Sequence, residues 1–242
     1  MCRQASLSLL FLALGVIGCG SVSRSADTAA DQTAASAFNW RDPIMIDEFD
    51  GSELGSHWNV YDSPGHAGNG LRSPDQAAVD DGLLTITGTA AGTTAGMAWQ
   101  PGQMYGRWEV RMRAAAGCGC YHPVLILWPD ANDFPVGGEV DFAEVFAADR
   151  QEVNFFLHFS ERNDQIKATQ EIDVTEWHNY AVEWTADHVT GFIDGRQWFT
   201  TGDAEKLPPR PMHLTIQLDW FPGDGDASEG ATMEVDWVRI YE

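Results

Sequence analysis

Basic residues are scarce in this sequence: 14 Lys and Arg stand against 36 Asp and Glu, and the formal net charge at pH 7 is -22. The field of such a surface repels phosphate backbones and polymers that carry sulfate or carboxylate groups. We therefore expect no nucleic acid partner, whereas a neutral glycan meets no such repulsion. Because acidity also keeps an exported protein soluble, the charge narrows the class of partner without naming one.

The amino terminus lacks an apolar run that is long enough to span a bilayer. Its run covers residues 7–17 and follows the basic residue Arg3, which is typical of an export signal. Residues 1–18 are therefore predicted to be a signal peptide. The run ends at Cys19 in a segment that resembles the lipobox of bacterial lipoproteins, whose Cys becomes lipid-modified. We expect an exported protein that meets a membrane only through Cys19, with full secretion as the alternative.

Cysteine is also scarce, with 4 residues in the chain. Cys2 and Cys19 belong to the signal region, so the folded domain keeps only Cys118 and Cys120. An exported domain can form disulfides, but a pair two residues apart closes a tight ring with little gain in entropy. A bridge and two free thiols are therefore equally open. Neither Cys has a His or an acid at a spacing that suggests catalysis or zinc.

Helical periodicity is absent from the rest of the chain. Residues 19–37 are small and polar, which predicts a flexible tether that begins at the anchor Cys. Residues 38–242 read as one domain without internal repeats, expected to be monomeric, in which β-rich runs alternate with turn signals. This pattern predicts an all-β sandwich of two antiparallel sheets. The predicted strands are residues 44–49, 83–87, 107–113, 124–128, 139–146, 153–159, 180–184, 189–193, 213–218 and 233–241.

Three acids in one predicted strand are the sharpest feature. Alternation of side chains places Glu139 and Asp141 on the same face. One extra residue, most simply a β-bulge at Ala143, returns Glu144 to that face. Carboxylates this close raise one another's pKa, which a purely structural strand does not need. Glycoside hydrolysis does need it, because one carboxylate attacks the anomeric carbon while a protonated partner donates to the leaving oxygen.

The same E-x-D-x-x-E spacing recurs at Glu171, Asp173 and Glu176, so spacing alone does not identify a site. The first copy follows a Gly-rich approach and continues as an apolar strand. The second copy runs into a turn before the next strand and is typical of a solvated edge. We therefore predict that the first copy is the active site and that the second is inert.

The chain resembles family 16 of the glycoside hydrolases, a jelly-roll, concanavalin A-like group of retaining, endo-acting enzymes. The resemblance implies that Glu139 is the nucleophile, Asp141 its helper and Glu144 the acid/base. The extra residue resembles the bulge-bearing branch, which includes laminarinase-like β-1,3-glucanases. We expect hydrolysis of a neutral β-linked polysaccharide, most simply a β-1,3-glucan. The segments that carry the resemblance are residues 46–51, 105–109, 139–144, 177–184 and 235–241.

The resemblance also implies a substrate cleft. For each aromatic residue predicted to lie in this cleft, and for the predicted His, the alternative interpretation is that the side chain packs in the hydrophobic core. The Gly-rich loop 65–72 departs from the laminarinase pattern, so the exact polymer stays open. The predicted substrate-binding residues are Asn69, Arg72, Trp128, Phe134, His158, Gln217 and Trp220.

Many members of this family carry a structural calcium ion. The resemblance implies ligation by the Asp236 side chain and by the backbone oxygens of Glu48 and Gly82, an all-oxygen set that suits a hard cation. We expect no cofactor for the chemistry itself.

Two other functions compete with hydrolysis. A non-catalytic, lectin-like glycan-binding module can share this sandwich, but a binder has no need of three clustered acids. A polysaccharide lyase on a similar jelly roll needs basic residues to handle a uronate, which the acidic composition disfavours.

Overall fold

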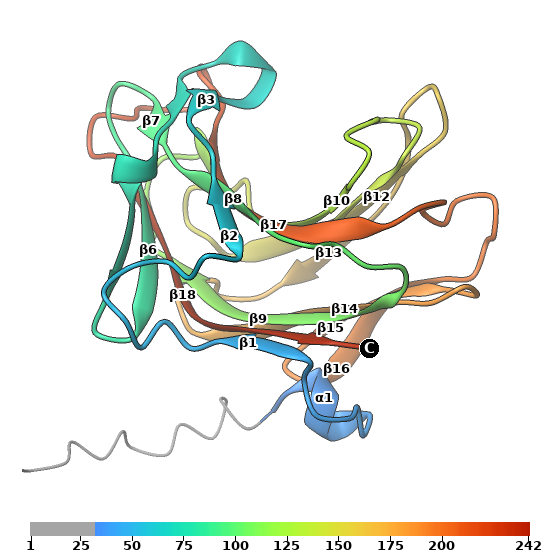
Figure 1. The fold of residues 1–242 in the computed structure, drawn as a ribbon. Helices are drawn as coiled ribbons and strands as arrows, with labels where there is room; N and C mark the ends of the chain where they lie inside the picture. Colours follow the sequence, from blue (N-terminus) through green and yellow to red (C-terminus); the bar gives the residue numbers. More distant parts are fainter. Residues whose placement is uncertain (1–31) are drawn as a thin grey trace, which may run out of the picture.

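Two antiparallel sheets lie face to face in this computed structural model, which describes residues 32–242 (Figure 1). One sheet, named the cleft sheet here because one of its faces lines a cleft, has the order β13-β12-β11-β10-β17-β8-β2. The outer sheet has the order β16-β15-β14-β9-β18-β6-β5, with β1 paired to β18. The predicted all-β sandwich is confirmed. The predicted signal peptide and Cys19 lie outside the described residues.

The strands of the cleft sheet are β2 (Trp58–Val60), β8 (Gly96–Trp99), β10 (Tyr121–Pro129), β11 (Glu139–Glu144), β12 (Glu152–Phe159), β13 (Asp164–Glu171) and β17 (Met212–Trp220). Those of the outer sheet are β1 (Met45–Asp47), β5 (Ala77–Asp80), β6 (Leu83–Gly88), β9 (Gly106–Ala114), β14 (His178–Trp184), β15 (Val189–Ile193), β16 (Arg196–Thr201) and β18 (Ala231–Tyr241). A small third sheet holds β3 (Ser63–Pro64), β4 (Leu71–Arg72) and β7 (Thr93–Thr94). The short helices are α1 (Ala34–Ala37), η1 (His66–Gly68) and η2 (Pro74–Gln76).

The hydrophobic core fills the space between the two large sheets. Alternate residues of each strand supply it, as Leu125 and Leu127 of β10 and Trp108 of β9 illustrate. The intervening residues of the cleft sheet, such as Val124 and Ile126, point the other way and line a cleft. The period of two along each strand therefore separates a packed face from a ligand-accessible face.

Tight turns join several neighbouring strands where the sequence predicts them. Asp81 and Gly82 connect β5 to β6, and Asp194 and Gly195 connect β15 to β16. All four residues have positive φ, which is the conformation that a two-residue hairpin requires and that Asp-Gly tolerates. Strands β2, β5, β8, β13 and β16 and the three short strands β3, β4 and β7 were not predicted.

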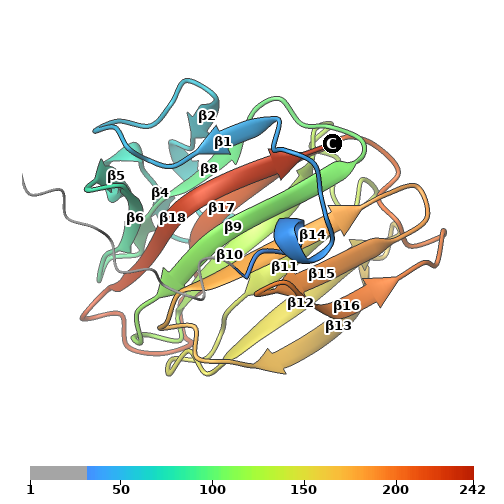
Figure 2. The same cartoon turned by 90° about the horizontal axis from the view of Figure 1, so that it is seen from below.

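The predicted tether extends too far into the domain. Residues 34–37 form α1, which lies against the outer sheet (Figure 2). Thr33 and Ala34 are buried, and the Ala34 N–H donates to Glu109 of β9 over 2.6 Å. The small residues of this segment form no pattern that indicates a helix. The residues that they contact lie far along the chain, so the sequence does not show that the segment packs on the outer sheet.

The structure joins Cys118 and Cys120 by a disulfide, which resolves the open choice in favour of the bridge. The bond closes a ring around Gly119, immediately before β10. Within residues 32–242, no helix has the length and apolar character needed to cross a membrane.

Candidate active site

A β-bulge in β11 places all three predicted catalytic acids on the cleft face. In the pairing of β11 with β10, Asp141 lies opposite Ile126 and Ala143 lies opposite Leu125. Phe142 therefore has no partner in β10, and the same irregularity shifts the register with β12. The predicted bulge exists, although the skipped residue is Phe142 and not Ala143. Phe142 is fully buried, so the core holds the bulge in place.

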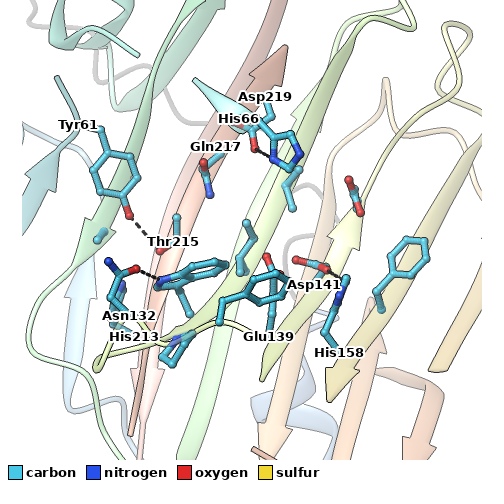
Figure 3. A pocket seen from close by; sticks show the side chains of 18 of the residues that line it. Tyr61, His66, Asn132, Glu139, Asp141, His158, His213, Thr215, Gln217 and Asp219 are labelled. Carbon is cyan, nitrogen blue, oxygen red and sulfur yellow. Dashed lines mark hydrogen bonds and ion pairs between the residues drawn. The ribbon is translucent and has the colours of Figure 1, made fainter. Parts of the chain in front are cut away.

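The cleft has a volume of about 990 Å³ and runs across the cleft sheet. Glu139, Asp141 and Glu144 all line it, and their neighbours come from β10, β12 and β17 (Figure 3). The lining carries five carboxylates, at Asp130, Glu139, Asp141, Glu144 and Asp219, but only one Lys or Arg side chain, Arg72.

Glu139 and Asp141 form a buried acid pair beside His158. Burial is the main cause that raises the pKa of the Glu139 carboxyl well above its ordinary value, and the neighbouring Asp141 adds to it. Burial likewise raises the pKa of Asp141, with Glu144 as the next cause. His158 Nε2 lies 3.2 Å from Asp141 Oδ2, while its Nδ1 lies 2.7 Å from Asn163 Oδ1. The pair therefore holds on to a proton that two exposed carboxyl groups would release.

Glu144 lies at the other end of the bulge and has a different neighbour. His122 Nδ1 is 3.5 Å from Glu144 Oε1. The His122 ring is buried and stacks on Phe221, with 4.0 Å between centroids and 19° between planes. Each outer acid thus has its own imidazole: His158 serves the Glu139 end and His122 the Glu144 end.

Two aromatic side chains line the Glu139 end of the cleft. Trp128 and Phe134 stack with ring centroids 5.3 Å apart, and both line the cleft as predicted. Trp128 Nε1 donates to Asn132 Oδ1 over 2.9 Å, which fixes the indole plane. Phe134 is 37% exposed, so its ring is available to stack on a sugar.

A polar cluster forms the opposite end of the cleft. Arg72 donates from Nε and Nη2 to Asp219 Oδ1, at 3.2 and 2.6 Å, and lies over the ring of Tyr61. Asp219 Oδ2 is also 3.8 Å from His66 Nδ1. Gln217 is 93% buried, and its Oε1 has no hydrogen-bond partner among residues 32–242. Arg72 and Gln217 thus lie in the cleft as predicted, and Gln217 has an acceptor to offer a sugar hydroxyl.

Two predicted cleft residues do not line it. Trp220 packs partly against the core and lies under the small sheet, where a Cβ on Gly92 would come within 2.3 Å of its ring. Asn69 lies in the loop after η1 and is also absent from the lining. The alternation of β17 explains the first error, because Gln217, Asp219 and the following Phe221 face the cleft and Trp220 faces away.

Sequence analysis missed several cleft residues. His122 precedes the predicted strand start at Val124, and His213 lies on the predicted strand but was not singled out. The period-two pattern was available to find both, since His122 shares the cleft face with Val124 and Ile126. His213 Nδ1 lies 2.7 Å from Asp130 Oδ1. The other missed lining residues that carry polar groups or rings are Asn59, Tyr61, Ser63, His66, Gln100, Asp130, Asn132, Phe146, Phe156, Asn163, Gln165, Thr215, Asp219 and Phe221.

The predicted calcium ligands lie on the outer sheet and in the segments beside it, and their donor set fits a calcium ion poorly. The Asp236 carboxylate is the one side-chain ligand of the set, and Arg111 Nε lies 3.1 Å from its Oδ2. A guanidinium at this distance already neutralises the carboxylate and repels a divalent cation. The calcium site stays a prediction, and a melting temperature that a chelator leaves unchanged would contradict it.

The fold and the cleft define a class: a jelly-roll sandwich with clustered carboxylates on its concave face. The model of glycosyl hydrolases family 16 matches residues 67–239, and the chain belongs to this family. A protein named "Beta-glucanase" from Rhodothermus marinus is 25% identical over 164 residues, which are 57% of this chain and 57% of that protein. "Crh-like protein 3" from Botryotinia fuckeliana is 26% identical over 175 residues, 65% of this chain and 37% of that protein.

Solved structures share the fold at low identity. The laminarinase catalytic domain of Thermotoga maritima superimposes with a TM-score of 0.74 at 22% identity, over 84% of this chain and 98% of that domain. The chain thus spans nearly the whole of that domain, but only 57% and 37% of the two curated relatives named above.

Proposed function

We propose that the protein is a retaining, endo-acting hydrolase of a neutral β-glucan, most simply of the β-1,3-linked type. The single observation that carries this proposal is the placement of Glu139, Asp141 and Glu144 side by side in an open cleft. Family membership and the name of the Rhodothermus relative support the substrate class. The cleft supports a neutral polymer, because its carboxylates outnumber its one guanidinium.

In the proposed reaction, Glu139 attacks the anomeric carbon while Glu144 protonates the glycosidic oxygen. The bond from carbon to the glycosidic oxygen breaks as the bond from carbon to Glu139 forms. Water then attacks the anomeric carbon of the glycosyl-enzyme and gives a proton to Glu144, while the bond from this carbon to Glu139 breaks and frees the carboxylate; two inversions retain the configuration. This outcome requires carboxyl groups about 5–5.5 Å apart.

Asp141 is proposed to carry the one proton of the acid pair, so that Glu139 remains ionised. His158 Nδ1 lies 2.7 Å from Asn163 Oδ1, and its Nε2 faces Asp141 Oδ2 at 3.2 Å. A protonated Asp141 donates to that nitrogen or to Glu139. Because one proton satisfies this buried pair, Glu139 is left as the carboxylate that attacks.

Reducing-end release from laminarin, lichenan and agarose tests the function. We expect release from laminarin by the wild type and none above background by Glu139→Gln. Glu171→Gln is the matched control, because it alters the inert copy of the motif. Binding of laminarin without release by any protein would favour the lectin-like alternative over the hydrolase.

Export is a further part of the proposal. The chain enters the domain on the outer sheet, opposite the cleft, where Phe38 packs on Phe192 and Trp40 packs on Phe192 and Tyr241. An anchor at Cys19 would therefore leave the cleft accessible. Labelling of cells with a clickable fatty acid tests this: we expect label on wild type and none on Cys19→Ala. Equal labelling of both would contradict acylation at this residue.

A further inference from the structure

The His122 imidazole is held in one orientation. It is 7% exposed and lies between Phe221 on one side and Phe146, whose centroid is 4.9 Å away. Its Nε2 lies 3.1 Å from the Gly119 carbonyl oxygen. A carbonyl oxygen only accepts hydrogen bonds, so Nε2 carries the hydrogen and Nδ1 is the nitrogen that faces the cleft.

This second nitrogen is directed at the acid/base. Nδ1 is buried, has no hydrogen-bond partner among the described residues, and lies 3.5 Å from Glu144 Oε1. His122 is also the register partner of Asp219 on β17. The Asp219 carboxylate, however, is bonded to Arg72 and faces His66. Glu144 is therefore the carboxyl group that Nδ1 meets.

The loop before β10 fixes Gly119, and with it His122. Gly119 lies inside the ring that the Cys118–Cys120 bridge closes. Arg150 is fully buried and donates to the carbonyl oxygens of Cys118 and Tyr121, at 3.2 and 3.0 Å. A buried guanidinium that binds backbone carbonyls on both sides of Gly119 leaves this loop little freedom.

We propose that His122 is a positioning residue for Glu144. Its contact with Oε1 determines which of the two oxygens of the Glu144 carboxyl group carries the catalytic proton. The proposal rests on the proposed glycosidase function and adds a residue to it. With Nε2–H engaged by Gly119, Nδ1 presents a lone pair to Oε1 of Glu144. The acid proton of Glu144 is then held on Oε1, the oxygen that faces Nδ1, and passes from there to the glycosidic oxygen.

The same contact serves both steps of the reaction. In the first step, the proton passes from Glu144 Oε1 to the glycosidic oxygen, which leaves Glu144 as a carboxylate beside the lone pair of Nδ1. In the second step, this carboxylate takes a proton from the attacking water and returns to its initial state. His122 forms and breaks no covalent bond to the substrate. Its loss should therefore affect substrates in proportion to their need for protonation of the leaving group.

Aryl β-laminaribiosides with different leaving groups test this role. Dinitrophenolate leaves without protonation, whereas an unsubstituted phenol needs the acid. For His122→Phe, which keeps the aromatic stack but loses both nitrogens, we expect kcat/KM on the phenyl glycoside to fall about 10- to 100-fold. On the dinitrophenyl glycoside, we expect a change of less than about threefold in the cleavage step measured by the initial burst.

Two further variants keep the test independent of folding. His122→Asn places an amide near the position of Nδ1 and should recover part of the lost activity on the phenyl glycoside. His178→Phe is the matched control, because His178 pairs with Asp194 at 2.7 Å on the outer sheet. It should leave the ratio of the two activities unchanged, whatever its effect on stability.

The possible outcomes distinguish a failure of the proposed role of His122 from a failure of the proposed glycosidase function. An inactive wild type on both glycosides would overturn the glycosidase proposal and the role of His122 with it. An active wild type with equal losses on both glycosides in His122→Phe, or with no loss, would overturn the role of His122 alone. A selective loss on the phenyl glycoside supports the inference.

Discussion

Two segments of this chain share the spacing E-x-D-x-x-E but differ in every physical property that matters for catalysis. Glu139, Asp141 and Glu144 lie on β11, which has β10 and β12 on either side. Glu171 ends the edge strand β13, and Glu176 lies in the turn beyond it. The first segment has a bulge and lines a cleft, whereas Glu171 and Glu176 are exposed to solvent.

The central acids of the two segments show the contrast in electrostatics. Burial raises the pKa of Asp141 well above its ordinary value. Asp173 is exposed, and hydrogen bonds from the Thr175 hydroxyl and N–H lower its pKa. The same residue type at the same place in a motif is thus shifted in opposite directions. The neighbouring strands and the core, and not the spacing, make an active site.

The largest difference is expected for the first acid of each motif. Glu139→Gln removes the proposed nucleophile and should lower kcat on laminarin by at least about 10⁴-fold. Glu171→Gln changes an exposed side chain and should stay within about twofold of wild type. Initial rates of reducing-end release measure both. A collapse of turnover in Glu171→Gln would reverse the assignment of the two motifs.

The last acid of each motif should give a smaller but still clear difference. Glu144→Gln keeps the shape of the side chain but removes the acid, which should lower the rate on laminarin about 10²- to 10⁴-fold. Its partner in the comparison, Glu176→Gln, should have no measurable effect. A variant Glu144→Gln with normal rates on substrates that need leaving-group protonation would exclude Glu144 as the acid.

The middle acids should differ in the sign of their effect on stability. In the folded state the pKa of Asp141 is raised, so this group opposes folding once the pH rises above about 3.8, and increasingly so up to its folded pKa. Asp141→Asn does not titrate and should therefore stabilise the protein at pH 7. The advantage should vanish as the pH falls toward 3.8. Urea unfolding at several pH values measures it.

Asp173→Asn is the matched variant for this effect. The pKa of Asp173 is lowered on folding, so the group contributes stability above the unfolded pKa and loses it as the pH falls through the folded pKa. Its replacement should therefore lower the stability slightly at pH 7. If Asp141→Asn and Asp173→Asn shift the free energy of unfolding in the same direction at pH 7, the electrostatic contrast between the motifs is wrong.

A substitution of Glu109, on the outer sheet, should have the smallest effect on activity and tests the pH dependence of stability away from the two motifs. Burial raises the pKa of Glu109 from 4.5 to about 7, which means that the folded state binds a proton that the unfolded state has lost between these values. Stability from this group should fall as the pH rises from 4.5 to 7, by at most about 3 kcal/mol. Glu109→Gln should flatten this decline and leave kcat unchanged. A decline of the same size in the variant would assign it to other groups.

Local patterns predicted the sandwich and most of the catalytic segment. Alternation placed Asp141 beside Glu139, and the parity of the strand required the bulge before Glu144. The skipped residue was placed one position too late, at Ala143, because both Phe142 and Ala143 are apolar and only the register with β10 distinguishes them. Interactions between neighbouring residues were therefore predictable, whereas register was not.

The errors share a physical cause, which is dependence on distant partners. Trp220 was assigned to the cleft because its segment resembles the family's sugar-stacking walls, although the alternation that starts at Gln217 places it on the other face. His122 was missed because its partners Gly119, Glu144 and Phe221 come from the loop before β10, from β11 and from the segment after β17. Ala34 belongs to no sequence pattern, and its burial depends on the distant residues Glu109, Ala181 and Phe192.

Trapping of the covalent intermediate tests the central claim most directly. A laminaribioside with fluorine at the second sugar carbon and a good leaving group forms the glycosyl-enzyme but slows its hydrolysis. After digestion, mass spectrometry should find the sugar on the peptide that contains Glu139, and on Glu139 itself. A sugar attached to Glu144 or Glu171, or turnover to an inverted product without any adduct, would contradict the account.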